Sequence, residues 1–289
     1  MKMSLVLLSL IPRLLGVTSQ LSVKLEDVIT TTARTTAATT TTKTMMRTAP
    51  KLSPYCQPKL CPKGQTHVAC ESYYKSLYRS CAAKETVLVN MTTHAETILK
   101  QHNERRYLLA SGKDSSLPRA ARMVAMQWDE DLAAVAGFNA RMCQPKHDDC
   151  RNTVKFPRSG QNIIVFNMTR RVDKELMEKL YPKLLSIAVK TWWTESQKMS
   201  AGNMELYPCD EKKQEAYRHF AVMAIEGNSH VGCAGLRYVL GNLTQFKLTC
   251  NYARAPVCGQ PIYRFQHVGC QTGRNKKHSS LCSPMELFR

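Results

Sequence analysis

The twelve cysteines of this sequence are the residues whose type and number point most clearly to a chemistry. Thiols either pair as disulfides in an oxidising compartment or, when reduced, bind metals. Zinc sites use short spacings such as Cys-x-x-Cys, and none occurs between Cys56 and Cys81. The even count therefore predicts a disulfide framework rather than a reduced cytosolic enzyme. Its members are Cys56, Cys61, Cys70, Cys81, Cys143, Cys150, Cys209, Cys233, Cys250, Cys258, Cys270 and Cys282.

Sequence motifs that mark several enzyme classes are missing from the chain. It has no G-x-S-x-G nucleophile elbow, no H-E-x-x-H zinc motif, no glycine-rich phosphate loop and no dinucleotide-binding fingerprint. Nothing in the sequence assembles a nucleophile with a base and an orienting group. We therefore predict that the protein is not an enzyme.

Composition and charge narrow the class of protein further. Of the 289 residues, 43% are hydrophobic, which is enough for a core and excludes disorder of the whole chain. No apolar run reaches the ~18 residues that a membrane-spanning helix needs, so we expect no transmembrane segment. After residue 50, the chain has 35 basic and 20 acidic side chains, a net charge of +15. Such a balance favours an acidic partner, although it also simply confers solubility.

Hydrophobic spacing predicts the helices that would position any functional residues. A helix is expected over 93–112, whose first residue would form a capping box with Glu96. A second helix should start near Asp129. A third should cover 173–194, with Pro182 kinking or dividing it.

Shorter periods follow in the second half of the chain. Three β-like runs, 219–225, 230–239 and 244–252, are separated by turn-prone Gly-Asn pairs. Helices followed by hairpin-linked strands predict an α+β domain with helices packed on an antiparallel sheet. The segment 258–289 is polar and should be a tail pinned by its cysteines.

The start of the chain is typical of a secreted protein. Residues 1–19 have the charge, the apolar stretch and the small residues of a signal peptide cleaved before Gln20. The threonine-rich segment 20–50 should be a disordered linker, either an O-glycosylated stalk or an unmodified spacer. Three sequons predict surface N-glycans at Asn90, Asn167 and Asn242.

An ordered series of short motifs between Tyr55 and Cys282 resembles the CAP superfamily of cysteine-rich secretory, antigen 5 and pathogenesis-related 1 proteins. Within it, the insect antigen 5 proteins are the most similar, and the closing Cys270-Gln-Thr-Gly and Leu281-Cys282 resemble the tail of fly relatives. The matching segments are Tyr55-Cys56, Leu60-Cys61, His67-Val-Ala-Cys70, Ile98-Leu-Lys-Gln-His-Asn-Glu-Arg105, Met123, Trp128-Asp-Glu-Asp-Leu132, Cys143, His147-Asp148, Cys150-Arg-Asn-Thr153, Gly160-Gln-Asn-Ile163, Trp193-Thr-Glu195, His219-Phe220, Val231-Gly-Cys233 and Cys250-Asn-Tyr252.

The resemblance implies an α–β–α sandwich, with a cysteine-rich lead-in over 51–90, a CAP domain over 91–257 and the tail over 258–289. It also implies four disulfides, Cys56–Cys70, Cys61–Cys150, Cys81–Cys143 and Cys233–Cys250. The remaining Cys209, Cys258, Cys270 and Cys282 allow three pairings, which the sequence does not rank.

The resemblance further implies a central cleft lined by two histidines and two acidic groups. Carried over, these positions are His147, His219, Glu195 and, in place of an acidic residue, Gln161. An amide cannot act as a general base, so only Glu195 could take that role. Two imidazoles and one carboxylate could hold Zn²⁺, with His147 and His219 as the ligands carried over from the family. Alternatively, both histidines are structural.

Three functions remain open from the sequence. The first is a secreted, non-enzymatic protein that binds an extracellular protein, glycan or cell surface, with basic residues at Lys146, Arg151, Lys155 and Arg158 and at Arg274, Lys276 and Lys277. The second, drawn from the resemblance, is a carrier of a small lipid or sterol. The third is a residual zinc-dependent hydrolase. No recognition helix or aromatic-interleaved basic motif predicts nucleic acid as a partner.

Overall fold

The computed structural model describes residues 19–23, 54–70, 84–114, 117–266 and 269–288. The predicted signal segment up to residue 18, the linker from residue 24 and Cys81 lie outside these residues. No helix in the described part of the chain is both long and apolar enough to cross a membrane.

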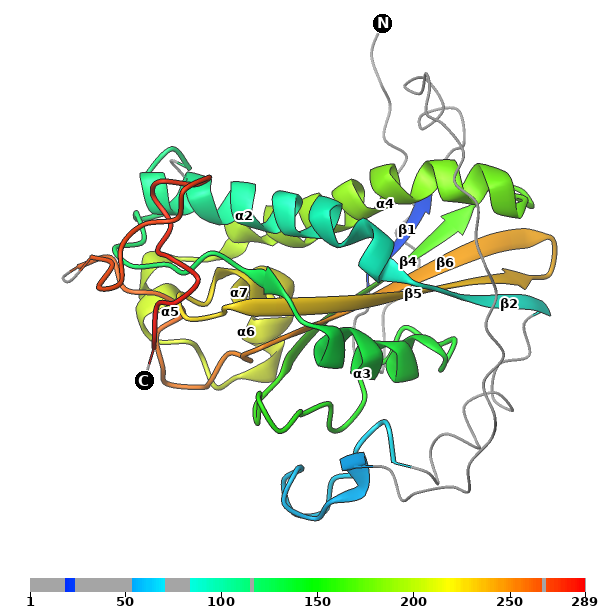
Figure 1. Ribbon diagram of the computed structural model, residues 1–289, viewed down its shortest axis with the longest axis horizontal. Helices are drawn as coiled ribbons and strands as arrows, with labels where there is room; N and C mark the ends of the chain where they lie inside the picture. The colour runs from blue at the N-terminus through cyan, green and yellow to red at the C-terminus, as the bar shows by residue number, and fades with distance from the viewer. Residues whose placement is uncertain (1–18, 24–53, 71–83, 115–116, 267–268, 289) are drawn as a thin grey trace, which may run out of the picture.

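A six-stranded sheet forms the middle of the molecule (Figure 1). Along the sheet the strand order is β1-β4-β6-β5-β2, and β3 pairs with β5. The pairs β4–β6, β5–β6 and β2–β5 are antiparallel, whereas β1–β4 and β3–β5 are parallel. The strands are β1 (Ser19–Val23), β2 (Lys84–Val89), β3 (Gln127–Trp128), β4 (Gly160–Met168), β5 (His230–Leu240) and β6 (Leu243–Tyr252).

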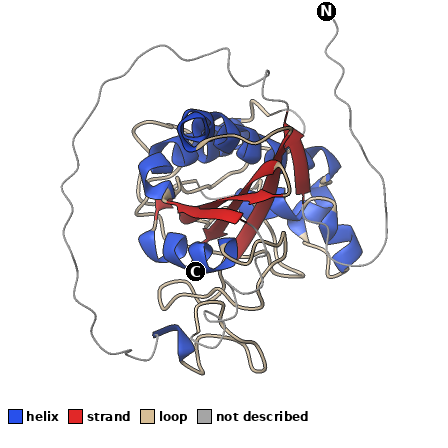
Figure 2. Cartoon of the chain, turned by 90° about the vertical axis from the view of Figure 1, so that its right-hand side faces the viewer, coloured by secondary structure: helices blue, strands red, loops and turns tan. Residues whose placement is uncertain are grey.

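Helices cover both faces of this sheet, which confirms the α+β class and the α–β–α sandwich (Figures 1 and 2). The long helices α2 (Ala95–Ser111) and α4 (Lys174–Thr194) pack together on one face, and α3 (Glu130–Ala140) packs against β5 and β6 on the other. The short helices are α5 (Ala201–Glu205), α6 (Glu211–Glu215) and α7 (Arg218–Ala224). Single 3-10 turns are η2 (Pro54–Cys56), η3 (Met91–His94) and η4 (Glu195–Lys198).

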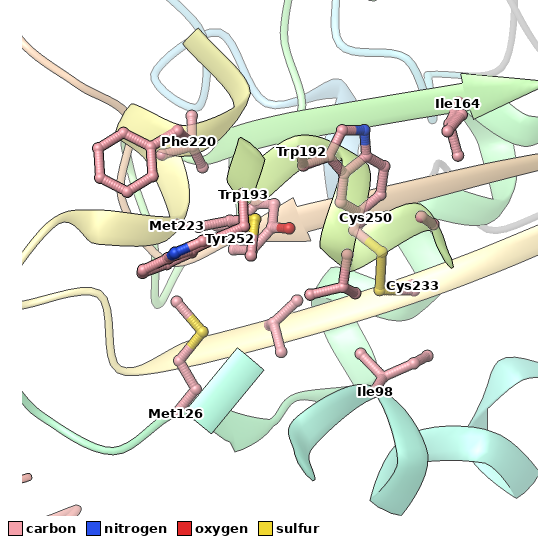
Figure 3. Packing of buried hydrophobic residues seen from close by; sticks show 14 of the residues in the cluster. Ile98, Met126, Ile164, Trp192, Trp193, Phe220, Met223, Cys233, Cys250 and Tyr252 are labelled. Atoms are coloured by element: carbon pink, nitrogen blue, oxygen red, sulfur yellow. A yellow bond between two sulfur atoms is a disulfide. The ribbon is translucent and has the colours of Figure 1, made fainter. Parts of the chain in front are cut away.

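The two faces of β6 differ in polarity because side chains alternate along a strand. Phe246, Leu248 and Cys250 join the main apolar core. Their neighbours Lys247 and Thr249 bond to Asn139 of α3 on the other face. The main core, shown in Figure 3, includes Ile98, Met126, Ile164, Trp192, Trp193, Phe220, Met223, Cys233, Cys250 and Tyr252.

Three helices were predicted nearly where they occur, with two corrections at the residue level. The capping box predicted at Thr93 is wrong: the Asn90 side chain accepts from the Thr92 N–H and caps η3, and Thr93 Oγ1 donates to the Asn90 carbonyl. Helix α4 is not divided at Pro182 and is continuous from Lys174 to Thr194.

The strand predicted over 219–225 is also wrong, because these residues form helix α7. Every residue from His219 to Ala224 is buried. A short, wholly apolar run has no polar side to reveal its period, so the sequence could not distinguish a buried strand from a buried helix.

Residues 20–23 belong to β1 rather than to the irregular start of the predicted linker. They pair in parallel with β4, from Ser19 opposite Ile164 to Val23 opposite Met168. This pairing satisfies the outer edge of β4, which would otherwise present a row of unpaired backbone N–H and C=O groups.

Disulfides tie the lead-in and the tail to the sandwich. Of the pairings that the resemblance implied, the structure contains Cys56–Cys70, Cys61–Cys150 and Cys233–Cys250. Cys143 is also disulfide-bonded. The four cysteines left unpaired by the resemblance form Cys209–Cys258 and Cys270–Cys282.

Candidate functional site

The four cleft residues come from four different elements at one end of the sheet. Gln161 is the second residue of β4 and lies opposite Asn251 of β6. His147 precedes β4 in an irregular segment, whereas Glu195 begins η4 at the end of α4. His219 lies in the first turn of α7. The end of α4 and the start of α7 therefore meet the beginning of β4.

Glu195 and His219 form one hydrogen-bonded unit. Glu195 Oε1 lies 2.6 Å from His219 Nδ1, and its Oε2 accepts from the backbone N–H of His219 at 2.9 Å and of Phe220 at 3.3 Å. An ionised carboxylate only accepts hydrogen bonds, so His219 must carry its proton on Nδ1. In the neutral form of the imidazole the lone pair is then on Nε2, a buried atom that has no hydrogen-bond partner among the described residues.

His147 is held in the same tautomer through Gln161. The Gln161 amide nitrogen donates to Asp148 Oδ2 at 2.8 Å and to Asn251 Oδ1 at 3.0 Å. This leaves its oxygen to accept from His147 Nδ1, at 2.7 Å. Like His219, His147 therefore presents a lone pair on Nε2.

Burial keeps His147 neutral. Loss of hydration lowers the pKa of His147 to about 4, and the positive charges of Arg151 and Arg218 act in the same direction. His219 is close enough to add a small effect of the same sign. At neutral pH the site thus contains a neutral imidazole at position 147, the form that binds metals.

Below these residues a polar network connects the cleft to α3. Asp148 accepts hydrogen bonds from Asn139 at 2.8 Å and from Arg151 at 2.6 Å. Burial raises the pKa of Asp148, but Arg151 and the hydrogen bonds outweigh burial and lower it overall. Lys247 donates to the Asn139 carbonyl at 2.7 Å, and burial lowers its pKa to about 7.

The network residues were missed by sequence reasoning, although a signal was present. Lys247, Thr249 and Asn251 alternate with apolar residues along β6, which is typical of a strand whose second face meets polar groups. Asn139 gave no such signal because it lies within an otherwise apolar helix segment.

The predicted ligand set of His147, His219 and Glu195 is not assembled as expected. Glu195 bonds to Nδ1 of His219, the nitrogen opposite the free Nε2, so it orients the imidazole instead of sharing a ligand position. Within the described residues no group of three or more His, Cys, Asp or Glu side chains could hold a metal ion. What the site offers to a ligand is two Nε2 lone pairs.

Of the four basic residues predicted to cluster between 146 and 158, two form ion pairs and two do not. Arg151 bonds to Asp148 at 2.6 Å and Lys155 to Asp129 at 3.0 Å. Lys146 and Arg158 take part in no ion pair among the described residues. Only these two of the four basic residues therefore keep an uncompensated charge.

A separate cavity bears on the predicted lipid carrier. It has a volume of about 450 Å³ and lies between β2, η3 and α3. Leu88, Met91, Ala133 and Phe138 are among its apolar lining residues, and Arg141 is one of its few charged ones. Its shape and lining are compatible with a small apolar ligand.

The three predicted glycosylation sites differ in exposure. Asn90 and Asn242 are exposed, Asn90 as the cap of η3 and Asn242 in the turn between β5 and β6. Asn167 is half-buried within β4, between β1 and β6. A glycan at Asn90 or Asn242 would therefore be easier to accommodate on the folded protein.

Comparison with known proteins places this chain in a family. Residues 99–252 match the cysteine-rich secretory protein family, CAP. The chain is 33% identical over 245 residues to Venom allergen-1 of Aedes aegypti, covering 81% of this chain and 89% of that protein. It is 31% identical over 192 residues to Antigen 5 like allergen Cul n 1 of Culicoides nubeculosus, covering 64% and 83%.

Solved structures show the same fold. The crystal structure of NaASP2 with Zn²⁺ aligns with a TM-score of 0.50 and 23% sequence identity, covering 65% of this chain and 94% of that chain. The family match over more than half of the sequence and the 33% identity to a relative of which 89% is covered settle the family. The chain belongs to the cysteine-rich secretory protein (CAP) family and is similar to the venom allergen and antigen 5 proteins of insects.

Proposed function

We propose that this protein is secreted and acts outside the cell by binding an anionic partner, a sulfated glycan, and not by catalysing a reaction. The observation that carries the non-catalytic part of this proposal is the position of Glu195. Both of its oxygens accept hydrogen bonds from α7, and the second acidic position of the cleft is a glutamine. A carboxylate engaged in this way is a poor general base.

The charge of the chain supports an anionic partner. The net charge after residue 50 is +15. A surface with one sign of charge raises the local concentration of oppositely charged ligands and speeds their encounter. The similarity to named venom allergens and antigen 5 proteins supports the extracellular location.

Heparin chromatography of the secreted protein tests this function. We expect retention on heparin with elution only at raised salt, because interactions between exposed charges are screened over about 8–10 Å at 0.1–0.15 M salt. The control is a column that carries the same polysaccharide after chemical desulfation. Equal, weak retention on both columns would refute the proposal.

A second candidate function is binding of a divalent metal ion, and the unpartnered Nε2 of His219 specifically favours it. Two imidazoles with Nδ1 held by oxygen acceptors suit zinc as donors through Nε2, and zinc is present in the NaASP2 structure. His147 and His219 would hold the ion, which would act as a Lewis acid. With two protein ligands, the affinity should be modest.

Calorimetric titration with zinc chloride at pH 7 tests the metal site. We expect one site per chain that is lost in His219→Ala and retained in His94→Ala, a histidine of η3 outside the cleft. Unchanged zinc binding by the His219→Ala protein would remove the metal candidate. Carriage of a lipid and zinc-dependent hydrolysis stay predictions from the sequence.

A further inference from the structure

Three arginines from two distant parts of the sequence line one pocket. Arg158 precedes β4, Arg254 follows β6, and Arg264 lies in the segment leading to the tail. All three line a cavity of about 380 Å³ that also includes Glu226 and Phe288. The pocket does not include the cleft histidines. Sequence reasoning did not find it, because Arg158 and Arg254 are 96 positions apart in the chain.

The charges in this pocket do not balance. Arg264 bonds to Glu226 through its guanidinium at 2.5 Å and through its backbone N–H at 2.9 Å, which compensates one positive charge. The Arg254 guanidinium donates to the neutral carbonyl of Phe288 at 2.7 Å and keeps its charge. Arg158 has no hydrogen-bonded or ionic partner for its side chain in the described part of the chain. Two guanidinium charges therefore remain available.

The backbone holds the two uncompensated arginines in place. The N–H of Arg254 donates to the Asn228 side chain at 3.1 Å, and its carbonyl accepts from the same amide at 3.3 Å. The carbonyl of Arg158 accepts from the Ala255 N–H at 2.9 Å. Arg158 is thus fixed beside the residue that follows Arg254, and little ordering of the backbone would be needed when a ligand binds.

We propose that this arginine pocket, defined by Arg158, Arg254 and Arg264, holds a sulfate group of a sulfated glycan. This inference rests on the proposed function and locates the glycan-binding site in the arginine pocket. The planar fork of paired N–H donors on a guanidinium group matches two oxygens of an oxyanion. The volume is at the lower end for ligand pockets and suits a compact ring.

The walls of the pocket favour a sugar over an acidic peptide. Pro256, Pro261 and Phe288 present rings and apolar surface between the charged groups. A pyranose ring has C–H faces that pack on such surfaces while its sulfate groups reach the arginines. An extended acidic peptide offers carboxylates but no comparable ring.

Calorimetric titration of the full-length secreted protein with a heparin hexasaccharide tests the pocket. We expect Arg158→Ala to weaken binding about five- to tenfold, because it removes one charged donor at a partly solvated site. Arg158→Lys should recover only part of the loss, since an ammonium lacks the paired N–H donors. The Arg158 side chain has no hydrogen-bonded or ionic partner among the described residues, so the melting temperature should stay unchanged.

The matched control is Lys190→Ala, which removes one charge from an exposed position of α4. We expect its affinity to stay within twofold of the unmodified protein. Equal weakening by both variants would mean that only net charge matters and would overturn the pocket. Undiminished binding by Arg158→Ala would also overturn the assignment of the glycan to this pocket, but it would leave the proposed function intact.

Two further outcomes separate the proposals. If the unmodified protein binds no hexasaccharide, the proposed function itself fails. If a polyglutamate peptide binds as tightly as the hexasaccharide and Arg158→Ala weakens the peptide equally, the pocket serves an acidic peptide and the glycan assignment is overturned. Preference for the hexasaccharide over its desulfated form and over the peptide supports the assignment.

Discussion

At the scale of single residues, Glu195 joins two roles in one carboxylate. It accepts the first N–H groups of α7 and fixes the proton of His219 on Nδ1. The first role is that of a helix cap and the second that of a partner which orients an imidazole. Substitution of this residue should therefore alter both stability and any ligand bound at Nε2.

Glu195→Gln should lower the free energy of unfolding by about 1–2 kcal/mol, because a neutral amide replaces a charged acceptor of several hydrogen bonds. Urea denaturation measures this change. The control is Glu211→Gln in the first turn of α6, at an exposed position with no described ion pair, which should change the value by less than about 0.5 kcal/mol. Equal effects of the two substitutions would contradict the capping role.

The two buried histidines His102 and His147 should make the protein less stable in mild acid. Burial lowers the pKa of each from 6.5 to about 4. Between these values the unfolded chain binds protons that the folded chain does not, so stability is full above pH 6.5 and falls as the pH approaches 4. Each histidine should lower the free energy of unfolding by up to about 1.4 kcal/mol for each pH unit of acidification in this range.

Urea denaturation at pH 4.5, 5.5 and 6.5 measures this slope. We expect His147→Gln to reduce it by roughly the share of one histidine, since the amide does not titrate. A slope that is the same in both proteins would show that His147 does not titrate as the structure implies.

Sequence reasoning named the four residues of the candidate site but not the hydrogen bonds that connect them. His147, His219, Glu195 and Gln161 were identified by resemblance. Their hydrogen bonds, which decide the tautomers and the role of Glu195, depend on side chains from β6 and on the direction in which α7 enters the site. Such contacts join residues up to 90 positions apart and leave no local pattern.

At the scale of elements, the position of α3 depends on a close approach to β5. A Cβ atom at Gly232 of β5 would lie 2.3 Å from both the Ala133 nitrogen and the Asp129 carbonyl oxygen. Backbone atoms cannot move away as a flexible side chain can, so the start of α3 packs directly on the strand. The glycine is needed for this approach, not for a special backbone angle.

Gly232→Ala should lower the free energy of unfolding by about 3 kcal/mol or more, because α3 would have to shift away from the sheet. Thermal and urea denaturation measure the loss. Gly202→Ala is the matched control: no atom lies within 4 Å of the new Cβ in α5, and alanine favours the helix, so stability should be unchanged or rise by up to about 1 kcal/mol. Similar effects at both glycines would contradict the close packing of α3.

The elements also show where periodicity succeeds and fails. Helices α2, α3 and α4 were predicted because each is long and apolar on one side. β4 was not predicted, because it is buried almost throughout and its apolar run has no alternation. For the same reason, because it has no polar side, α7 was wrongly predicted to be a strand.

At the scale of the whole molecule, one carboxylate of the tail connects several of its residues with each other and with Arg122 outside the tail. Glu286 accepts from Arg122, from the N–H groups of Gln271 and Thr272, and from the Thr272 hydroxyl. Burial alone would raise its pKa, but these hydrogen bonds outweigh burial and lower it to about 2. Its contribution to stability is thus present above pH 4.5 and is lost only as the pH falls towards 2.

Glu286→Gln should therefore destabilise the tail by about 1–3 kcal/mol at neutral pH. Hydrogen exchange of residues 269–288 should speed up more than that of β5 and β6, because the tail would open without unfolding of the sheet. An exposed control, Glu178→Gln of α4, should leave both exchange rates unchanged. Uniform acceleration over the whole chain would argue against local fastening.

The arrangement of the disulfides decides whether the fragments stay covalently joined after a protease cleaves the backbone. Two described bridges lie within residues 56–150 and three within 209–282, and none of these five joins the two groups. The exposed Arg170 and Arg171 lie between the groups, just after β4. A protease that nicks the chain there would leave two fragments joined by none of these bridges and held together by non-covalent contacts, among them the β4–β6 and β2–β5 ladders and the packing of α2 on α4. The nicked protein should pass through gel filtration as one particle yet separate into two bands in denaturing electrophoresis without any reductant. A nick between Cys61 and Cys150 would be invisible in that gel until the bridge is reduced.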